Sequence, residues 1–124
     1  MRRRFQLLGL VLFGALAAMV AGCSANPKSD CLSVCNEQND RMCNGRDGTT
    51  NCDAECSSAE TEYDDAIETA NRFGCRSEFD SFYGCLVGGD PCVSDRCNAE
   101  ITAVQSCSTT YCAANPTDPE CGAP

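Results

Sequence analysis

Apolar side chains in the middle of the chain recur at alternating steps of three and four residues. This spacing places them on one face of an α-helix, because an α-helix has about 3.6 residues per turn. Thr50 or Asn51 is suited to cap the start, and Gly74 to end the helix in the left-handed conformation. The pattern predicts one continuous helix of about six turns, and its apolar face is formed by Cys52, Cys56, Ala59, Tyr63, Ala66, Ile67, Ala70 and Phe73.

A shorter helical pattern precedes this segment. Either Ser29 or Asp30 is suited to be its N-cap, and Asn44-Gly45 is a good terminus. We therefore expect a first helix that starts near residue 31. One face of this helix is formed by Cys31, Val34, Cys35, Gln38 and Met42.

Two more helical patterns follow residue 74. Ser77-Glu78-Phe79-Asp80 matches a capping box and predicts a helix that ends at Gly88-Gly89. A fourth helix is expected from about Ser94 to Ala113, because Asn115-Pro116 then stops it. No segment alternates with period two, so the sequence predicts an all-α domain of about four helices in two helical hairpins.

The amino-acid composition indicates that the predicted helices depend on cysteines for their stability. After residue 22 the chain has 102 residues, of which only 11 are Leu, Ile, Val or Phe. This share is well below the roughly 20% under which a highly charged chain tends to be disordered. The chain also contains 13 cysteines, all of them after residue 22. Their share of these residues exceeds the roughly 8–10% that marks a disulfide scaffold, and such scaffolds belong to oxidising compartments. The sequence therefore predicts a small disulfide-rich domain outside the cytoplasm.

The N-terminus has the layout of a secretory signal. Three arginines precede an apolar run, and small residues precede a cysteine. Val20-Ala21-Gly22-Cys23 resembles the lipobox of bacterial lipoproteins. The resemblance implies that Cys23 is acylated, for example with palmitate, and that Ser24 directs the lipoprotein to the outer membrane. The alternative is an uncleaved signal anchor, because the apolar run is just long enough to span a bilayer.

The same resemblance divides the chain into three parts. Residues 1–22 are expected to be a lipoprotein signal peptide, and residues 23–30 the lipidated cysteine with a short polar tether. Residues 31–124 are expected to form the cysteine-rich helical domain. Attachment through two or three acyl chains is stable, whereas a single chain is not. The expected location is therefore the cell envelope.

The number of cysteines agrees with the lipobox. Assigning Cys23 to lipid leaves an even number, which allows six disulfides without a free thiol. The pairing itself is not determined by sequence. The disulfide-forming cysteines are expected to be Cys31, Cys35, Cys43, Cys52, Cys56, Cys75, Cys85, Cys92, Cys97, Cys107, Cys112 and Cys121.

Equal spacings favour some pairings over others. Antiparallel helices suit pairs whose residue numbers have a constant sum, because a step forward along one helix is a step back along the other. One set of such pairs resembles small helical-hairpin peptides with two CX3C motifs, and another resembles twin-CX9C hairpins. These pairs are Cys31–Cys56 with Cys35–Cys52, and Cys75–Cys107 with Cys85–Cys97. A ladder of Cys43–Cys52 with Cys35–Cys56 remains an alternative, and the other cysteines suffice for two further bridges.

The motifs of metal, redox and catalytic sites are missing from the sequence. There is no CxxC element and no His, so neither a thioredoxin-type or zinc-ribbon site nor a His-activated nucleophile is expected. The loop from Asn44 to Gly48 fails the EF-hand pattern, since Met42 and Asn51 would occupy ligand positions three and twelve. We expect a plain turn there, no cofactor and no metal.

Charge narrows the range of partners. Without the three leader arginines, the chain carries 6 basic and 18 acidic side chains, a net charge of −12. Nucleic acid is a poor partner for such a protein. Acidic residues are dense in the central helix, and a solvated face explains them best; they are Glu55, Glu60, Glu62, Asp64, Asp65 and Glu68. Phe79, Phe82 and Tyr83 are spaced for core packing.

These observations favour a non-enzymatic, lipid-anchored, disulfide-stabilised envelope protein that acts as a structural or interaction module. Its partners would be the membrane, through the lipid, and an envelope protein of unknown identity. In composition the chain resembles cysteine-rich bacterial lipoproteins, which implies no particular activity. A thiol-redox or metal-handling protein, or a small enzyme inhibitor, is the alternative. The first of these alternatives requires free or labile thiols.

Overall fold

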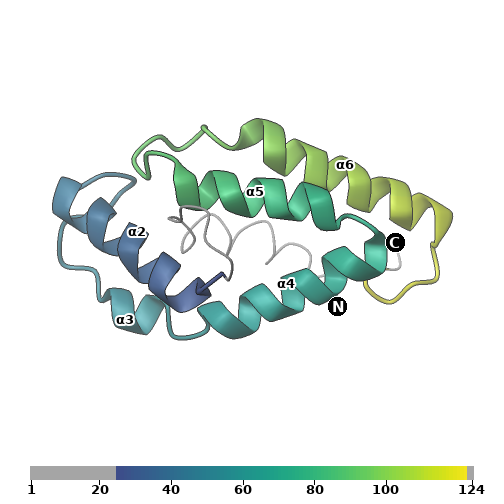
Figure 1. Cartoon of the computed structure of the whole chain (residues 1–124), viewed down its shortest axis with the longest axis horizontal. Coiled ribbons are helices and arrows are strands. Elements are labelled where there is room, and N and C mark those ends of the chain that lie inside the picture. The colour runs from purple at the N-terminus through teal and green to yellow at the C-terminus, as the bar shows by residue number, and fades with distance from the viewer. Residues whose placement is uncertain (1–24, 123–124) are drawn as a thin grey trace.

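The computed structural model describes residues 25–122, which form an all-helical domain (Figure 1). The signal peptide and Cys23 lie outside the described residues. The part of the chain that is described has no strand. Its four longer helices and one single-turn helix are α2 (Pro27–Arg41), α3 (Cys52–Glu55), α4 (Ala59–Phe73), α5 (Arg76–Gly88) and α6 (Asn98–Ala114).

The helices form two hairpins, as the sequence predicts. The first hairpin consists of α2 packed against α3 and α4, and the second of α5 packed against α6. A tight turn at Gly74 connects the hairpins, and α4 packs along α5 (Figure 1). Gly74 has a φ of 70°, the left-handed conformation that favours glycine at a helix end. The expected role of Gly74 is confirmed.

Helix α2 begins earlier than the sequence pattern indicates. It starts at Pro27, and Asn26 is its N-cap, with the Asn26 side chain accepting a hydrogen bond of 3.1 Å from the Ser29 backbone N–H. The expectation that Ser29 or Asp30 would be the cap is therefore wrong. Proline suits the first helical position because its missing N–H has no partner there in any case. Most of the expected polar tether is thus helical.

The end of α2 also differs from the expectation. The helix stops at Arg41, and Met42 adopts the left-handed conformation with a φ of 49°. Its backbone turns so that the Cys43 N–H donates to the Gln38 carbonyl at 3.1 Å. Met42 consequently leaves the helical face on which the spacing placed it, and its side chain is 70% exposed.

The long central helix is interrupted. Residues 52–73 contain a break between α3 and α4, so the expectation of one continuous helix is wrong. The Ser57 and Ala59 N–H groups donate to carbonyls three residues back, and the Ser57 hydroxyl donates to the Ala54 carbonyl at 2.8 Å. A serine hydroxyl competes with the helical backbone in this way and favours a tightened turn. The apolar face survives, since all eight of its residues are buried or half-buried.

The starts of the last two helices are shifted as well. Helix α5 begins at Arg76 with Cys75 as its N-cap, and the Ser77 hydroxyl donates to Glu78, so the expected capping box does not form. Helix α6 begins at Asn98, four residues after Ser94, and ends at Ala114, one residue after the expected Ala113. In both cases a disulfide-bonded cysteine occupies the N-cap position.

The core consists of two small clusters. One combines apolar residues of α4 and α5: Ala66, Ala70, Phe79, Tyr83 and Val87, with Tyr63, Ile67 and Leu86 at its margin. The other is formed almost entirely by cysteines that join α2 to α3: Cys31, Cys35, Cys52 and Cys56, with Ala59 and the half-buried Leu32. Among the described residues, six of the fifteen buried hydrophobic residues are therefore disulfide-bonded cysteines.

We predict that full reduction of the oxidised chain removes most of its helical circular-dichroism signal at ordinary temperature. Each bridge contributes about 2–4 kcal/mol by restricting the unfolded chain, whereas ordering each residue costs about 1–2 kcal/mol of backbone entropy. The two small clusters are insufficient to offset that entropy alone. Retention of most helicity after complete reduction at low salt would show that the apolar cluster of α4 and α5 holds the fold.

Candidate functional site at the junction of the two hairpins

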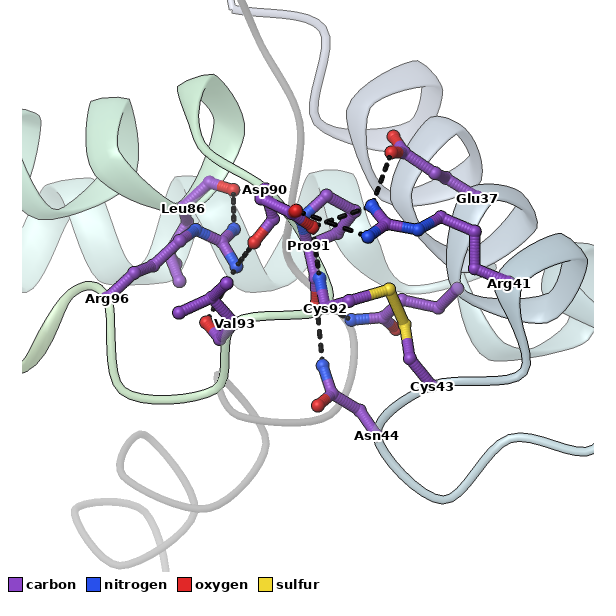
Figure 2. Close-up of polar contacts among 11 residues, drawn as sticks. Glu37, Arg41, Cys43, Asn44, Leu86, Asp90, Pro91, Cys92, Val93 and Arg96 are labelled. Carbon is purple, nitrogen blue, oxygen red and sulfur yellow. Dashed lines mark hydrogen bonds and ion pairs between the residues drawn. A yellow bond between two sulfur atoms is a disulfide. The ribbon is translucent and has the colours of Figure 1, made fainter.

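The two hairpins meet at one end of the domain, in a region that we call the junction. It comprises residues 37–46, at the end of α2 and in the following loop, and residues 86–96, at the end of α5 and in the loop to α6 (Figure 2). The Cys43–Cys92 disulfide crosses it, with a Cα–Cα distance of 5.4 Å. Among the described residues, this is the one disulfide that joins the first hairpin to the second.

An ion pair lies beside the disulfide. The Arg41 guanidinium donates to both carboxylate oxygens of Asp90, at 2.7 and 3.2 Å, and to Glu37 at 3.2 Å. The hydrogen bonds from Arg41 hold the pKa of Asp90 below its ordinary value. Because Arg41 and Asp90 are both exposed, the pair contributes little net stability. Its bidentate geometry instead fixes how the two loops approach each other.

The carbonyl oxygen of Pro91 is a second point of attachment. It accepts hydrogen bonds from the Gln38 side chain at 2.8 Å and from the Asn44 side chain at 2.6 Å. Arg46 donates to the other end of the Gln38 amide at 2.8 Å and forms an ion pair with Glu55 at 2.6 Å. Through this chain of contacts, the loop after α2 is bound to α3 on one side and to the second hairpin on the other.

Arg96 stabilises the loop between α5 and α6 through hydrogen bonds to the backbone. Its guanidinium donates to three backbone carbonyls, those of Leu86 at 2.6 Å, Asp90 at 2.6 Å and Val93 at 3.3 Å. No carboxylate in the described part of the chain forms an ion pair with it, and partial burial lowers its pKa. A cation at these carbonyls also complements the negative end of α5. A Cβ at Gly89 would lie 2.6 Å from the Arg96 Nε, so a larger residue there would displace the Arg96 side chain.

Two apolar side chains are exposed on either side of the disulfide. Met42 precedes Cys43 and is 70% exposed, and Val93 follows Cys92 and is 44% exposed. Within the described residues, these are the large hydrophobic side chains that remain in solvent. The junction thus combines an accessible disulfide, apolar neighbours and several arginines.

A second polar contact is buried between α2 and α5. The Tyr83 hydroxyl donates to Asp30 Oδ2 at 2.6 Å, while Asp30 Oδ1 has no hydrogen-bond partner and the residue is 1% exposed. Burial raises the pKa of Asp30, although the hydrogen bond from Tyr83 opposes this shift. Burial and the contact with Asp30 also raise the pKa of Tyr83. The ring of Tyr63, on α4, lies 4.7 Å from that of Tyr83.

The structure pairs all twelve cysteines that were expected to form disulfides. Of the two ladders that spacing left open, it contains Cys31–Cys56 with Cys35–Cys52, and the alternative ladder is absent from residues 25–122. The pairs Cys75–Cys107 and Cys85–Cys97 also agree with the constant-sum pattern. The remaining four cysteines form Cys43–Cys92 and Cys112–Cys121.

Most of the other sequence candidates lie where the simpler interpretation placed them. Glu60, Asp64, Asp65 and Glu68 are exposed on α4. Glu55 and Glu62 are instead half-buried: Glu55 pairs with Arg46, and Glu62 accepts a hydrogen bond of 2.6 Å from the Ser58 hydroxyl. The loop from Asn44 to Gly48 is a turn, held by the Asn44 and Arg46 contacts described above. The aromatic residues expected in the core, Phe79, Phe82 and Tyr83, are all buried.

The polar contacts of the junction and the Asp30–Tyr83 pair were not visible to sequence reasoning. Residues 30 and 83, like residues 41 and 90, are about fifty positions apart, and no local pattern connects such distant residues. One signal was available, because Asp30 falls one position before a buried cysteine on a predicted helix. The helical pattern assigns Asp30 to the cap instead.

No family model, curated protein or solved structure matches this chain. Within residues 25–122, no group of three or more metal-ligating side chains is brought together. The same residues contain no helix with the length and hydropathy that crossing a membrane requires. The geometry of the domain itself therefore carries the functional argument.

We predict that Asp30→Asn becomes progressively more favourable, relative to the natural chain, as pH rises. A carboxyl whose folded-state pKa is raised stabilises the fold below its unfolded pKa, near 3.9, and that stability is lost as pH rises through the folded pKa. The difference in unfolding free energy between the two proteins should therefore shift by up to about 1.4 kcal/mol per pH unit in that interval. Denaturant unfolding at a series of pH values measures it.

The matched control for Asp30→Asn is Asp65→Asn, which removes a carboxylate from the exposed face of α4. It separates the burial of Asp30 from the general loss of one negative charge. If Asp30→Asn and Asp65→Asn show the same pH trend, the burial of Asp30 is not what links stability to pH.

Proposed function

We propose that this protein is a lipid-anchored, non-enzymatic module of the bacterial cell envelope, attached through Cys23. The observation that carries the proposal is the pairing of the cysteines. All twelve cysteines of the described domain are joined to one another, so none is left for the thirteenth, which stands in the lipobox-like sequence. A cysteine without a disulfide partner at that position suits thioether attachment of lipid.

The proposed cellular location rests on the same disulfide bonds. Six disulfides in one small domain indicate an oxidising, extracellular or envelope-type environment. The outer membrane is the finer proposal and rests on Ser24 after the lipobox-like sequence.

The short distance from Cys23 to the first helix supports a role at the membrane surface. Helix α2 starts at Pro27, and four residues span at most about 14 Å. The anchored domain would therefore lie next to the lipid headgroups. Its net charge of −12, after removal of the leader, opposes close binding to an anionic membrane surface and to nucleic acid. The domain then presents its helices to other envelope proteins.

A thiol-redox role is the second candidate, and one observation favours it. Cys43 and Cys92 are both half-buried, whereas the four cysteines of the cluster between α2 and α3 are buried. Exposure of a disulfide is a condition for its exchange with external thiols.

We predict that Cys23→Ser abolishes incorporation of labelled palmitate and releases the protein from the membrane fraction. Serine has no thiol to carry a thioether-linked lipid, whereas the folded domain keeps all six disulfides. The measurement is metabolic labelling followed by membrane fractionation. A variant with both Cys112→Ser and Cys121→Ser is the control, since it loses two thiols but retains Cys23 and should be labelled normally. Unchanged labelling of Cys23→Ser would contradict the lipid anchor.

We also predict that mild crosslinking of the natural chain in its own envelope captures the same protein partner in repeated experiments. The Cys23→Ser variant, which is displaced from the membrane, should capture less of it. Capture at equal levels by both proteins would contradict a module that works at the membrane surface. Absence of any recurrent partner would favour a purely structural role.

A further inference from the structure

We propose that Cys43–Cys92 is a thiol-exchange site, which an external dithiol opens while the helices stay folded. The substrate class is a dithiol, either on a protein or on a small molecule. The proposal does not depend on the lipid anchor, because it concerns the oxidised domain alone. It rests on the accessibility of this bridge, on its position between the hairpins and on the charges around it.

Accessibility distinguishes this bridge from the two ladders. Cys31, Cys35, Cys52 and Cys56 are at most 6% exposed and form the cluster between α2 and α3. Each bridge of the second ladder has one buried partner, Cys75 or Cys97. Cys43 and Cys92, in contrast, are both half-buried, lie in loops and have an exposed neighbour. An attacking thiolate can therefore approach this bridge more readily than the buried ladders.

Opening the bridge leaves the internal bonds of both hairpins in place. The first hairpin retains Cys31–Cys56 and Cys35–Cys52, and the second retains the three other disulfides. The junction also keeps its polar contacts, since Gln38 and Asn44 still bind the Pro91 carbonyl. The two thiols would thus remain close enough to form the disulfide again by the reverse exchange, in which an external disulfide accepts the two electrons and is reduced to the dithiol.

The exchange is balanced in two steps. A thiolate of the external dithiol attacks one sulfur of the bridge, forming a mixed disulfide and releasing the other sulfur as a thiolate. The second thiolate of the dithiol then displaces the remaining cysteine. The products are two cysteine thiols in the protein, after protonation by water, and one oxidised external disulfide.

Two guanidinium groups lie near the bridge, together with the Asp90 carboxylate, whose Oδ1 accepts a hydrogen bond from the Cys92 N–H at 2.9 Å. Figure 2 shows the guanidinium groups of Arg41 and Arg96 beside the segment that contains Asp90 and Cys92. Arg41 is shared with Asp90, whereas Arg96 bonds only to backbone carbonyls among the described residues. Nearby cations stabilise a cysteine thiolate. Such cations are unusual in a chain that carries twice as many acidic as basic side chains.

Cys112–Cys121 is the bridge that competes most directly, because both of its cysteines are also half-buried. Its surroundings differ in charge. It closes a short loop of sequence separation 9, which contains Asp118 and Glu120. Asp118 is ion-paired with Arg72, as Asp90 is with Arg41, and Glu120 adds a further carboxylate that disfavours the approach of an external thiolate. This bridge joins α6 to the tail that follows it, whereas Cys43–Cys92 joins the first hairpin to the second.

The test is limited reduction of the oxidised full chain with dithiothreitol, followed by alkylation and mass spectrometry of the peptides. We expect Cys43 and Cys92 to be alkylated first, about tenfold faster than any other pair, which corresponds to a modest difference in barrier. The helical circular-dichroism signal should remain unchanged at that stage. Replacement of the dithiol by an external disulfide should restore the bridge. Earlier opening of Cys112–Cys121, or simultaneous opening of all six bridges, would overturn the proposal.

A double variant provides an independent arm. Replacing Cys43 and Cys92 together, as Cys43→Ser and Cys92→Ser, should leave the helical signal intact and abolish the early thiol release. The pair Cys112→Ser and Cys121→Ser is the matched control and should release the early thiols at the natural rate. If the first variant loses most of its helicity, the bridge is a structural bond and the exchange site is refuted.

Discussion

Disulfide bonds take the place of apolar side chains in much of the core of this domain. The cluster between α2 and α3 has four cysteines and a single alanine as its buried members, so the bonds that link the helices are also what the helices bury. A chain with so few large apolar residues has little other material for a core. The register of α2 against α3 follows from this constraint, because two disulfides one helical turn apart permit only one antiparallel alignment. The remaining contacts of the first hairpin are arranged around that alignment.

The second hairpin is built differently, and its links to the first include three of different kinds. Apolar residues of α4 and α5 pack between the hairpins, Tyr83 reaches Asp30 on α2, and Cys43–Cys92 crosses the junction. The first two contacts are buried, whereas the third is accessible to solvent. A domain joined in this way can keep its helices and its buried contacts between the hairpins when the accessible bridge opens. That property connects the fold to the proposed thiol exchange and to a module that contacts other envelope proteins.

The sequence was sufficient to predict which residues face inward, but not where the helices begin and end. The stripe from Cys52 to Phe73 identified the correct face because burial depends on periodicity, which survives a short break. At the break, the Ser57 hydroxyl donates a hydrogen bond to the Ala54 carbonyl. This local competition with the helical backbone is not detectable in the pattern of apolar residues. Met42 was misplaced for a related reason, since its left-handed backbone directs Cys43 toward a partner 49 residues away.

The candidate site was harder to predict than the fold. Cysteine spacing favours four of the six pairs, because bridged residues of antiparallel helices have residue numbers with a constant sum. The spacing carries no information on the loop that brings Cys92 to Cys43. The Asp30–Tyr83 pair and the contacts of Arg41, Arg46 and Arg96 depend on how the hairpins meet, which only the folded chain specifies.

The most direct test of the account is peptide mapping of the unreduced protein, to identify the six disulfides. We expect Cys31–Cys56 and Cys35–Cys52 together with Cys43–Cys92. A ladder of Cys35–Cys56 with Cys43–Cys52 would contradict both the core and the junction described above.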